Sequence, residues 1–144
     1  MPRKIAIGCD HAGYDLKVLI KEKLDAEEFS VSDYGTDSPD SVDYPDYVHP
    51  LASSIQNAEN ELGILICGSG NGVCMTANKH KGIRAALCWN EDLAALARQH
   101  NNANIICLPA RFIEPGLAVK CIEVFLHTDF EGGRHERRVS KIDC

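Results

Sequence analysis

Short apolar runs alternate with amphipathic segments along this chain, and that alternation constrains its fold more than any other feature. The apolar runs have the length of strands, and the segments between them carry apolar residues at three- and four-residue spacing, as helices do. Strands joined through helices pair in parallel, so the pattern predicts a parallel sheet with helices on both faces. The expected strands are 4–8, 29–33, 62–67, 83–88 and 105–108, and the expected helices are about 16–24, 46–58, 73–79, 90–100 and 115–127.

The fourth of these helices has the clearest local signals. Asn90 can cap its first turn, because an asparagine side chain accepts a hydrogen bond from a free backbone N–H there. Leu93, Leu96 and Ala97 recur at helical spacing and are expected to face the core.

The size and composition of the chain are those of one globular domain, which we expect to span residues 1–144. The 144 residues are 44% hydrophobic and 25% charged. A net charge of −6 argues against a general nucleic-acid binder, because phosphate backbones select basic surfaces. That charge is compatible with a small basic pocket for a single phosphate.

Seven cysteines favour a reducing compartment. Their number is odd, no Cys-x-x-Cys occurs, and the cysteine and histidine spacings match no zinc pattern. They are typical of reduced thiols and not of a disulfide framework. No signal peptide precedes the first strand and no apolar run reaches membrane-spanning length, so a cytoplasmic location is expected.

The stretch Ile64–Val73 carries the densest set of chemical groups. Its apolar run ends at Cys67, and three glycines follow at every second position with Ser69 between the first two. Glycines let the backbone turn sharply and approach a ligand, and successive N–H groups at a helix start bind anions. Open α/β sheets bind ligands where their strands end. The stretch therefore predicts a site with a thiol, a hydroxyl and a cradle of amide donors.

A purely structural interpretation of this stretch stays open, since many glycine turns only pack closely and free cysteines are often inert buried thiols. Two nucleotide-binding motifs are excluded. The third glycine comes one residue too early for Gly-x-Gly-x-x-Gly, and no Gly-Lys-Ser/Thr follows for a Walker loop.

Two polar segments lie outside the expected core. Residues 34–45 are rich in Gly, Ser, Asp and Pro and predict a loop of a length that is often functional. Residues from about 131 to 144 form a C-terminal extension, whose first part is basic in an acidic protein. Such a tail is either solvated or reaches an anion elsewhere, for instance in a neighbouring subunit.

Four motifs together resemble a single family. They are Gly8-Cys9-Asp10-His11-Ala12-Gly13, Ile66-Cys67-Gly68-Ser69-Gly70-Asn71-Gly72, Arg98-Gln99-His100-Asn101-Asn102-Ala103-Asn104 and Gly132-Gly133-Arg134-His135-x-x-Arg138-Val139. Each motif alone is weak. In order and at matching spacing over nearly the whole chain, they resemble ribose-5-phosphate isomerase type B, a family shared with the galactose-6-phosphate isomerase subunits.

The resemblance implies a fold, an assembly and a reaction. The fold is a Rossmann-like three-layer α/β/α sandwich with five parallel strands and a C-terminal helical extension. The assembly is a homodimer or a tetramer of dimers with active sites at the subunit interface. The reaction interconverts D-ribose 5-phosphate and D-ribulose 5-phosphate in the pentose phosphate pathway, through a cis-enediolate and without a metal or an organic cofactor.

The same match implies three catalytic residues. Cys67 would be the base that removes the proton from C2, and a nearby helix N-terminus can activate a thiol for this task. His100 would open the sugar ring, and Ser69 would pass the hydroxyl proton. Some family members carry a carboxylate base further along the loop, but Val73 and Cys74 stand there in this chain, which favours Cys67.

The other matched residues are implied to bind substrate. Amides of the glycine turn would hold the oxyanion, Asp10 and Asn101 would bind sugar hydroxyls, and Tyr44 would help to close the pocket. Arginine forks and a histidine would clamp the phosphate. The full set is Asp10, His11, Tyr44, Gly68, Gly70, Asn71, Gly72, Val73, Asn101, Arg111, Arg134 and Arg138.

Two other functions stay open at this point. A hexose 6-phosphate, such as that of allose or galactose, is one carbon longer and needs a longer pocket between His100 and the arginines. A non-catalytic phosphosugar-binding module would keep the glycine turn and the arginines, but it would not need Cys67 and His100 together.

Overall fold

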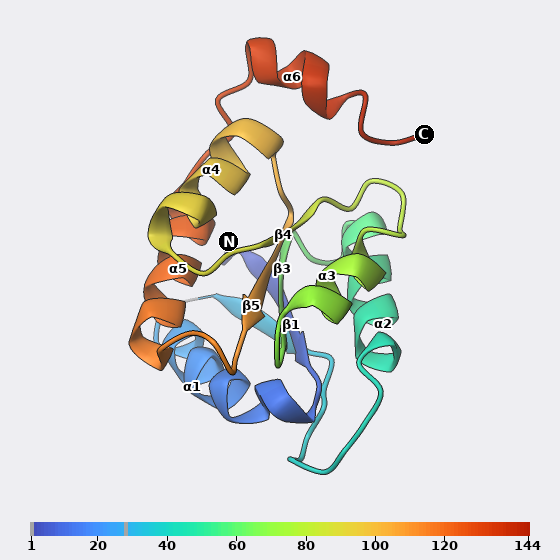
Figure 1. Ribbon diagram of the computed structural model, residues 1–144. Coiled ribbons are helices and arrows are strands. Elements are labelled where there is room, and N and C mark those ends of the chain that lie inside the picture. Colours follow the sequence, from blue (N-terminus) through green and yellow to red (C-terminus); the bar gives the residue numbers. More distant parts are fainter. Residues whose placement is uncertain (1, 28) are drawn as a thin grey trace.

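A five-stranded parallel sheet lies at the centre of the computed structural model, which describes residues 2–27 and 29–144 (Figure 1). The strand order is β2-β1-β3-β5-β4, and every neighbouring pair is parallel. The predicted parallel sheet is thus confirmed. The strands are β1 Lys4–Cys9, β2 Ser30–Asp33, β3 Leu62–Cys67, β4 Ala85–Leu87 and β5 Ile105–Pro109.

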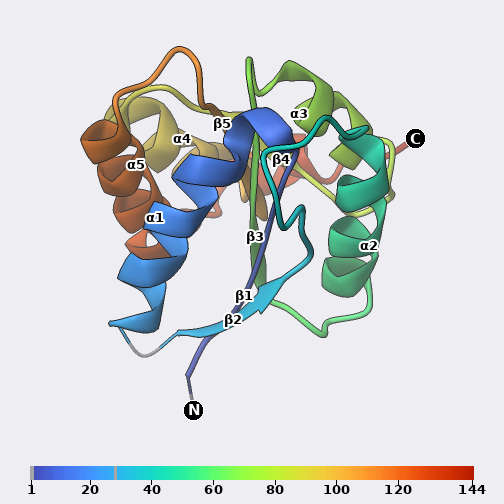
Figure 2. The ribbon, with the colours of Figure 1, turned by 90° about the horizontal axis from the view of Figure 1, so that it is seen from below.

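Helices cover both faces of this sheet and complete three layers. They are a 3-10 turn at His11–Gly13, α1 Tyr14–Asp25, α2 Pro45–Gln56, α3 Asn71–Ala77, α4 Glu91–Asn101, α5 Pro115–His127 and α6 Arg134–Val139. Figure 2 shows α1, α4 and α5 on one side of the sheet and α2 and α3 on the other. This arrangement confirms the Rossmann-like α/β/α sandwich, and α6 is the expected helical extension.

The core is divided between the two faces, because successive side chains of a strand point to opposite sides. Ile5 and Ile7 of β1 belong to the apolar cluster that packs against α1, α4 and α5. Leu65 and Cys67 of β3 belong to the cluster beneath α2 and α3. All six residues of β3 are buried, as expected for a central strand covered on both faces. Cys67 therefore ends the most enclosed strand of the sheet.

Helix α4 follows its sequence signals with one exception. The Asn90 side chain accepts a hydrogen bond from the N–H of Leu93 at 2.9 Å, so the predicted cap is confirmed. The prediction that Leu96 faces the core is wrong, since its side chain is 41% exposed. The buried positions are Ala94 and Ala97, whose small side chains let the helix approach its neighbours closely.

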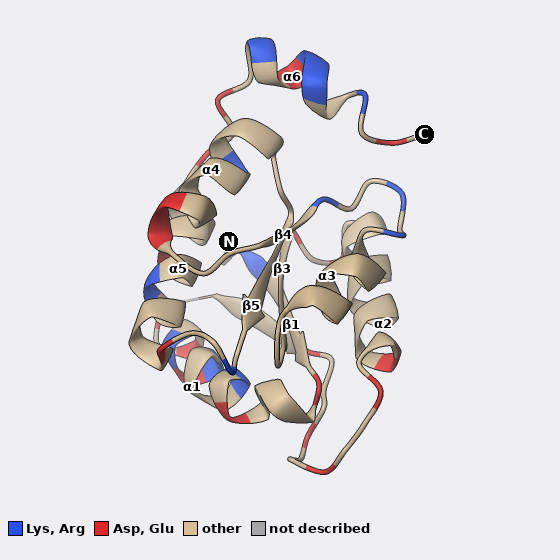
Figure 3. Ribbon diagram, viewed as in Figure 1, with Lys and Arg blue, Asp and Glu red and all other residues tan. Residues whose placement is uncertain are grey.

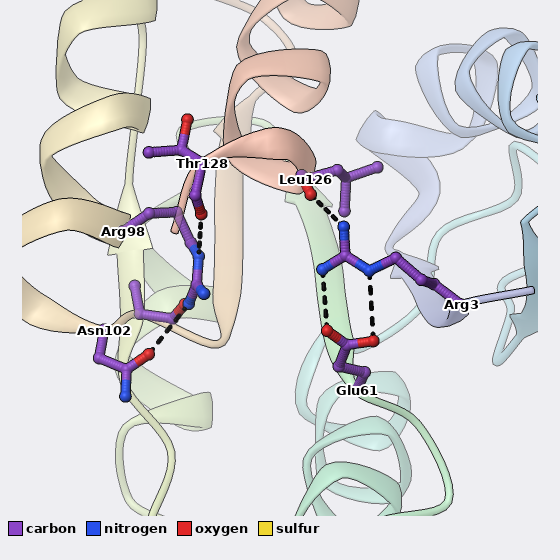
Figure 4. Close-up of polar contacts among 7 residues, drawn as sticks. Arg3, Glu61, Arg98, Asn102, Leu126 and Thr128 are labelled. Carbon is purple, nitrogen blue, oxygen red and sulfur yellow. Dashed lines mark hydrogen bonds and ion pairs between the residues drawn. The ribbon is translucent and has the colours of Figure 1, made fainter. Parts of the chain in front are cut away.

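Two arginines tie distant segments together (Figure 4). Arg3 forms an ion pair with Glu61 at 2.8 Å and donates to the carbonyl of Leu126 at the end of α5. Arg98 of α4 donates through Nε to the carbonyl oxygen of Thr128 at 3.1 Å. The hydrogen bond between Arg98 and Thr128 fastens the first residue of the segment that connects α5 to α6 against α4.

Helix α6 lies beyond the end of the sheet where the strands begin, far from the start of α3 (Figure 1). The N–H of Glu131 donates to the carbonyl of Gln99 at 3.1 Å, which fixes the approach to α6 against the last turn of α4. Among the described residues, none of the helices has the length and apolar character needed to cross a membrane.

Candidate active site

The carboxyl ends of β1, β3 and β5 meet at one edge of the sheet and form an open cleft there. Cys67, the last residue of β3, pairs in register with Pro109, the last residue of β5, and Cys9 of β1 pairs with Ile66. The cleft has a volume of about 500 Å³. Its lining residues are Asp10, His11, Ala12, Tyr44, Cys67, Gly68, Ser69, Gly72, Arg111 and Phe112.

Cys67 lines this cleft from a nearly enclosed position. The residue is 5% exposed and packs on its inner side against the cluster beneath α2 and α3. The N–H of Gly70 donates a hydrogen bond to Sγ at 3.2 Å. This bond fixes the sulfur against the turn that follows the strand.

Two glycines of the turn lie close to neighbouring atoms, and Gly70 is the more constrained of them. Gly70 has a φ of +77°, and a Cβ there would lie 2.4 Å from the side chain of Leu87 and 3.2 Å from the backbone of Leu108. A Cβ at Gly68 would lie 3.1 Å from Nη1 of Arg111, so the guanidinium rests against the turn. The turn thus brings both backbone amides and a cation to the sulfur's side of the cleft.

Asp10 and His11 are held by hydrogen bonds with the backbone. Oδ1 of Asp10 accepts from the N–H groups of Ala12 at 2.9 Å and Gly13 at 3.2 Å, and the residue is 7% exposed. Nδ1 of His11 accepts from the N–H of Val42 at 3.1 Å, which ties the 34–45 loop to the cleft. Because a neutral imidazole that accepts at Nδ1 carries its proton on Nε2, His11 can donate to an anion from that nitrogen.

Tyr44 and Ser69 stand on the open side of the cleft. The ring of Tyr44 lies against Gly72, where a Cβ would come within 2.5 Å of it. Oγ of Ser69 accepts from the N–H of Asn71 at 3.2 Å. Val73, also predicted to bind substrate, is fully buried and does not line the cleft.

The other predicted site residues lie at the opposite edge of the sheet. His100 and Asn101 are the last two residues of α4. Strand β5 begins shortly after them, at Ile105, so these two residues lie at the edge of the sheet where the strands begin. Arg134 and Arg138 share α6, as the four-residue spacing predicts for a helix. None of these four residues lines the cleft around Cys67. Within one copy of the described chain, the predicted set is therefore divided in two.

Three buried thiols outside the cleft, Cys9, Cys88 and Cys121, are packed in the core. Burial raises the pKa of Cys9 and of Cys88 to about 12, and that of Cys121 to about 11, so these groups stay protonated at pH 7. Cys74 has a lowered pKa because of a hydrogen bond with Cys107, yet its sulfur contacts the carbonyl of Ala85 at 3.3 Å and lies outside the cleft.

Sequence reasoning missed two residues at the second edge, Glu131 and His135. The ring of His135 stacks on that of His100, with centroids 4.1 Å apart, and Glu131 lies beside both. The i, i+4 spacing of Glu131 and His135 was the available signal, but the sequence does not indicate that α6 folds back onto α4.

Comparison with known proteins agrees with this fold. A family model described as Ribose/Galactose Isomerase matches residues 5–142. A probable ribose-5-phosphate isomerase B from Mycoplasma pneumoniae is 50% identical over 143 residues, covering 99% of this chain and 94% of the relative.

Two solved structures are similar over nearly their whole length. A ribose 5-phosphate isomerase from Thermotoga maritima is 52% identical with a TM-score of 0.96, covering 98% of this chain and 97% of that one. A ribose-5-phosphate isomerase B from Mycoplasma genitalium, with bound ribulose-5-phosphate, is 49% identical with a TM-score of 0.94, covering 99% and 95%.

Proposed function

The chain belongs to the ribose/galactose isomerase family, and we propose that it interconverts D-ribose 5-phosphate and D-ribulose 5-phosphate through a cis-enediolate. The observation that carries this proposal is the position of the Cys67 sulfur. Cys67 ends the central strand, its sulfur accepts a hydrogen bond from the turn at 3.2 Å, and the residue lines a cleft with polar and cationic walls.

In the proposed reaction Cys67 removes the proton from C2 of the open-chain aldose, and the proton returns at C1. The negative charge that develops on the oxygen is met by the amides of the turn that follows, which are oriented before the substrate arrives. Ser69 exchanges the hydroxyl proton between O1 and O2. Asp10 holds a sugar hydroxyl, and Tyr44 covers the bound chain.

The phosphate requires several donors, and the cleft around Cys67 offers His11 and Arg111. We propose that a second copy of the chain supplies the rest of the site, namely His100 and Asn101 from α4 and the two outer arginines of α6. The register supports this division, because Cys67 and His100 lie at opposite edges of one sheet. Such a site requires that two copies of the chain associate, either as a homodimer or as a pair within a tetramer of dimers.

Charge complementarity also supports a partner copy. Figure 3 shows acidic residues along the loop before α2 and in the first turn of α2, close to the Cys67 edge, and basic residues on α6 at the far edge. Two copies related by a twofold axis can place each basic helix beside the other's acidic loop.

A mixing experiment tests the reaction and the shared site together. Copies with Cys67→Ser and copies with His100→Asn are each expected to be inactive on ribose 5-phosphate. After unfolding and refolding together, half of the dimers are mixed, and each mixed dimer has one intact site out of two. The mixture should therefore regain about a quarter of the wild-type activity. No recovery in a mixture that forms dimers would contradict a site shared between copies.

A turnover assay with ribose, allose and galactose phosphates side by side separates the pentose substrate from a hexose 6-phosphate. The highest kcat/KM is expected for ribose 5-phosphate. A non-catalytic binding module would turn over none of them. Loss of activity on thiol alkylation, with protection by ribose 5-phosphate, would exclude that module.

The cytoplasm is the proposed location. The seven cysteines are free thiols in the described structure, as expected where glutathione and thioredoxin keep proteins reduced. Fractionation of cells that express the chain would test this, with activity expected in the soluble cytoplasmic fraction.

A further inference from the structure

Three side chains gather at the junction of α4 and α6. The rings of His100 and His135 are stacked, with centroids 4.1 Å apart and planes inclined by 11°. Oε1 of Glu131 lies 3.7 Å from Nε2 of His100 and 3.7 Å from Nε2 of His135. One carboxylate therefore faces the same nitrogen of two parallel rings.

Two hydrogen bonds between α4 and the segment that follows α5 hold this group in place. The N–H of Glu131 donates to the carbonyl of Gln99, the residue before His100, at 3.1 Å. Arg98 donates to the carbonyl of Thr128, at the start of the same connection (Figure 4). Both bonds fasten the segment between α5 and α6 to the last turns of α4.

The two histidines differ in exposure. The side chain of His135 is 11% exposed, whereas that of His100 is 39% exposed. Burial, followed by the nearby charge of His100 and the guanidinium groups of Arg134 and Arg138, lowers the pKa of His135. His135 is thus an uncharged, enclosed ring beneath a ring that is open to a ligand.

A metal ion does not suit this arrangement, although three potential ligands lie within 4.8 Å of one another. A histidine nitrogen binds a metal with a lone pair that lies in the plane of its ring. Rings stacked 4.1 Å apart and nearly parallel share no point close to both planes. The geometry instead fits an arrangement in which the ring of His135, as a stacking platform, and the carboxylate of Glu131 orient the ring of His100.

We propose that His135 and Glu131 are positioning residues for His100 in the ring-opening step, an inference that rests on the proposed function. Opening the furanose ring requires a proton to be delivered to the ring oxygen along a fixed direction. Stacking on His135 restricts rotation of the His100 ring. The carboxylate of Glu131 lies 3.7 Å from Nε2 of His100, where it limits tilting of the ring and offsets the positive charge of Arg134 and Arg138.

The test separates ring opening from proton transfer at carbon. Ribose 5-phosphate is mainly a closed furanose, whereas ribulose 5-phosphate stays acyclic because its C5 oxygen is esterified. In His135→Ala, kcat for ribose 5-phosphate should fall about 10- to 100-fold, the scale of a small misplacement of a catalytic group. Exchange of the C1 proton of ribulose 5-phosphate with D₂O, which needs no ring opening, should stay within about twofold of wild type.

Conservative variants distinguish the platform from other roles. His135→Phe keeps a flat ring and should restore most of the lost kcat, and Glu131→Gln should lower kcat less than His135→Ala does. Arg137→Ala serves as the matched control, since Arg137 is exposed on the same helix and has no assigned role. An equal fall in exchange and turnover in His135→Ala would overturn the proposal. So would a raised KM at unchanged kcat, which would indicate a direct contact with the phosphate.

A crystal structure of His135→Ala keeps this proposal separate from the proposed function. More than one orientation of the His100 ring is expected there, and a single unchanged orientation would overturn the positioning role. Absence of C1 proton exchange in a correctly folded wild-type protein would instead refute the proposed isomerase activity.

Discussion

The two edges of the sheet carry complementary halves of the proposed site, and they are built very differently. At the carboxyl edge, a buried sulfur ends a fully enclosed strand, and backbone groups of a tight turn surround it. At the amino edge, arginines and a histidine extend from helix ends, with α6 only six residues long. The more enclosed edge holds the group proposed to break a carbon–hydrogen bond, which demands accurate placement. The other edge holds long cations that can adapt to a phosphate.

Removing the sulfur should have the largest effect. Cys67→Ser leaves a hydroxyl that is a far weaker base than a thiolate, so proton exchange at C2 should fall about 10³-fold or more. Phosphate binding should persist, because the cations remain. Isotope exchange followed by NMR measures the first quantity, and titration calorimetry with ribose 5-phosphate measures the second. Unchanged turnover would show that Cys67 is not the base. The carboxyl edge would then have no claim to be the edge where the carbon–hydrogen bond is broken.

Removing a cation at the other edge should have a smaller and more selective effect. Arg134→Ala loses charge-assisted hydrogen bonds worth about 1.5–3 kcal/mol, so kcat/KM for ribose 5-phosphate should fall about 10- to 100-fold. Binding of unphosphorylated ribose should hardly change. Arg137→Ala, on the same helix, provides the control. Equal losses for both sugars would show that Arg134 does not contact the phosphate.

The rigidity of the carboxyl edge can be tested through its turn. Gly70→Ala combines a positive φ with a Cβ only 2.4 Å from Leu87, and should cost about 2–4 kcal/mol in the free energy of unfolding. Gly116→Ala in α5 is the matched control, since a Cβ there meets nothing within 4 Å, and it should be neutral or slightly stabilising. Denaturant unfolding of both variants gives the comparison. Similar free energies of unfolding for the two variants would mean that the turn accommodates a Cβ at position 70 without strain.

Lowering the pH should reduce the contribution of His135, at the amino edge, to the stability of the fold. This is the smallest of the expected effects. The pKa of His135 is lowered by burial and by His100, Arg134 and Arg138, with Glu131 acting in the opposite direction. Below the ordinary histidine pKa of about 6.5 the unfolded chain therefore binds more protons at this residue than the folded chain does. Its contribution to stability is complete above that pH and declines as the pH falls through it.

His135→Phe removes the titrating group and should flatten part of this pH dependence. Unfolding measured in urea at several values between pH 5 and 8 provides the test. The proton-linked slope of the wild type and of the variant should differ in the acidic half of that range. Identical slopes would mean that His135 titrates alike in the folded and unfolded chains.

Much of the fold followed from local patterns in the sequence. The strand ending at Cys67, the cap at Asn90 and the helical spacing of Arg134 and Arg138 depend on neighbouring residues alone, and all three are found in the structure. The prediction for Leu96 failed because the rotation of α4 about its axis depends on what packs against it. Periodicity indicates an apolar face, but the surrounding elements select which residues of that face are buried.

The sequence by itself determined the layered α/β fold and placed a thiol, a hydroxyl and a glycine turn at the end of one strand, because hydrophobic periodicity and glycine geometry act over a few residues. Only the tertiary structure decided that Cys67 and His100 lie at opposite edges of the sheet, and that His135 stacks beneath His100. Both depend on the path of the chain through space, where residues 30 or more positions apart meet only after the sheet and its helices have packed.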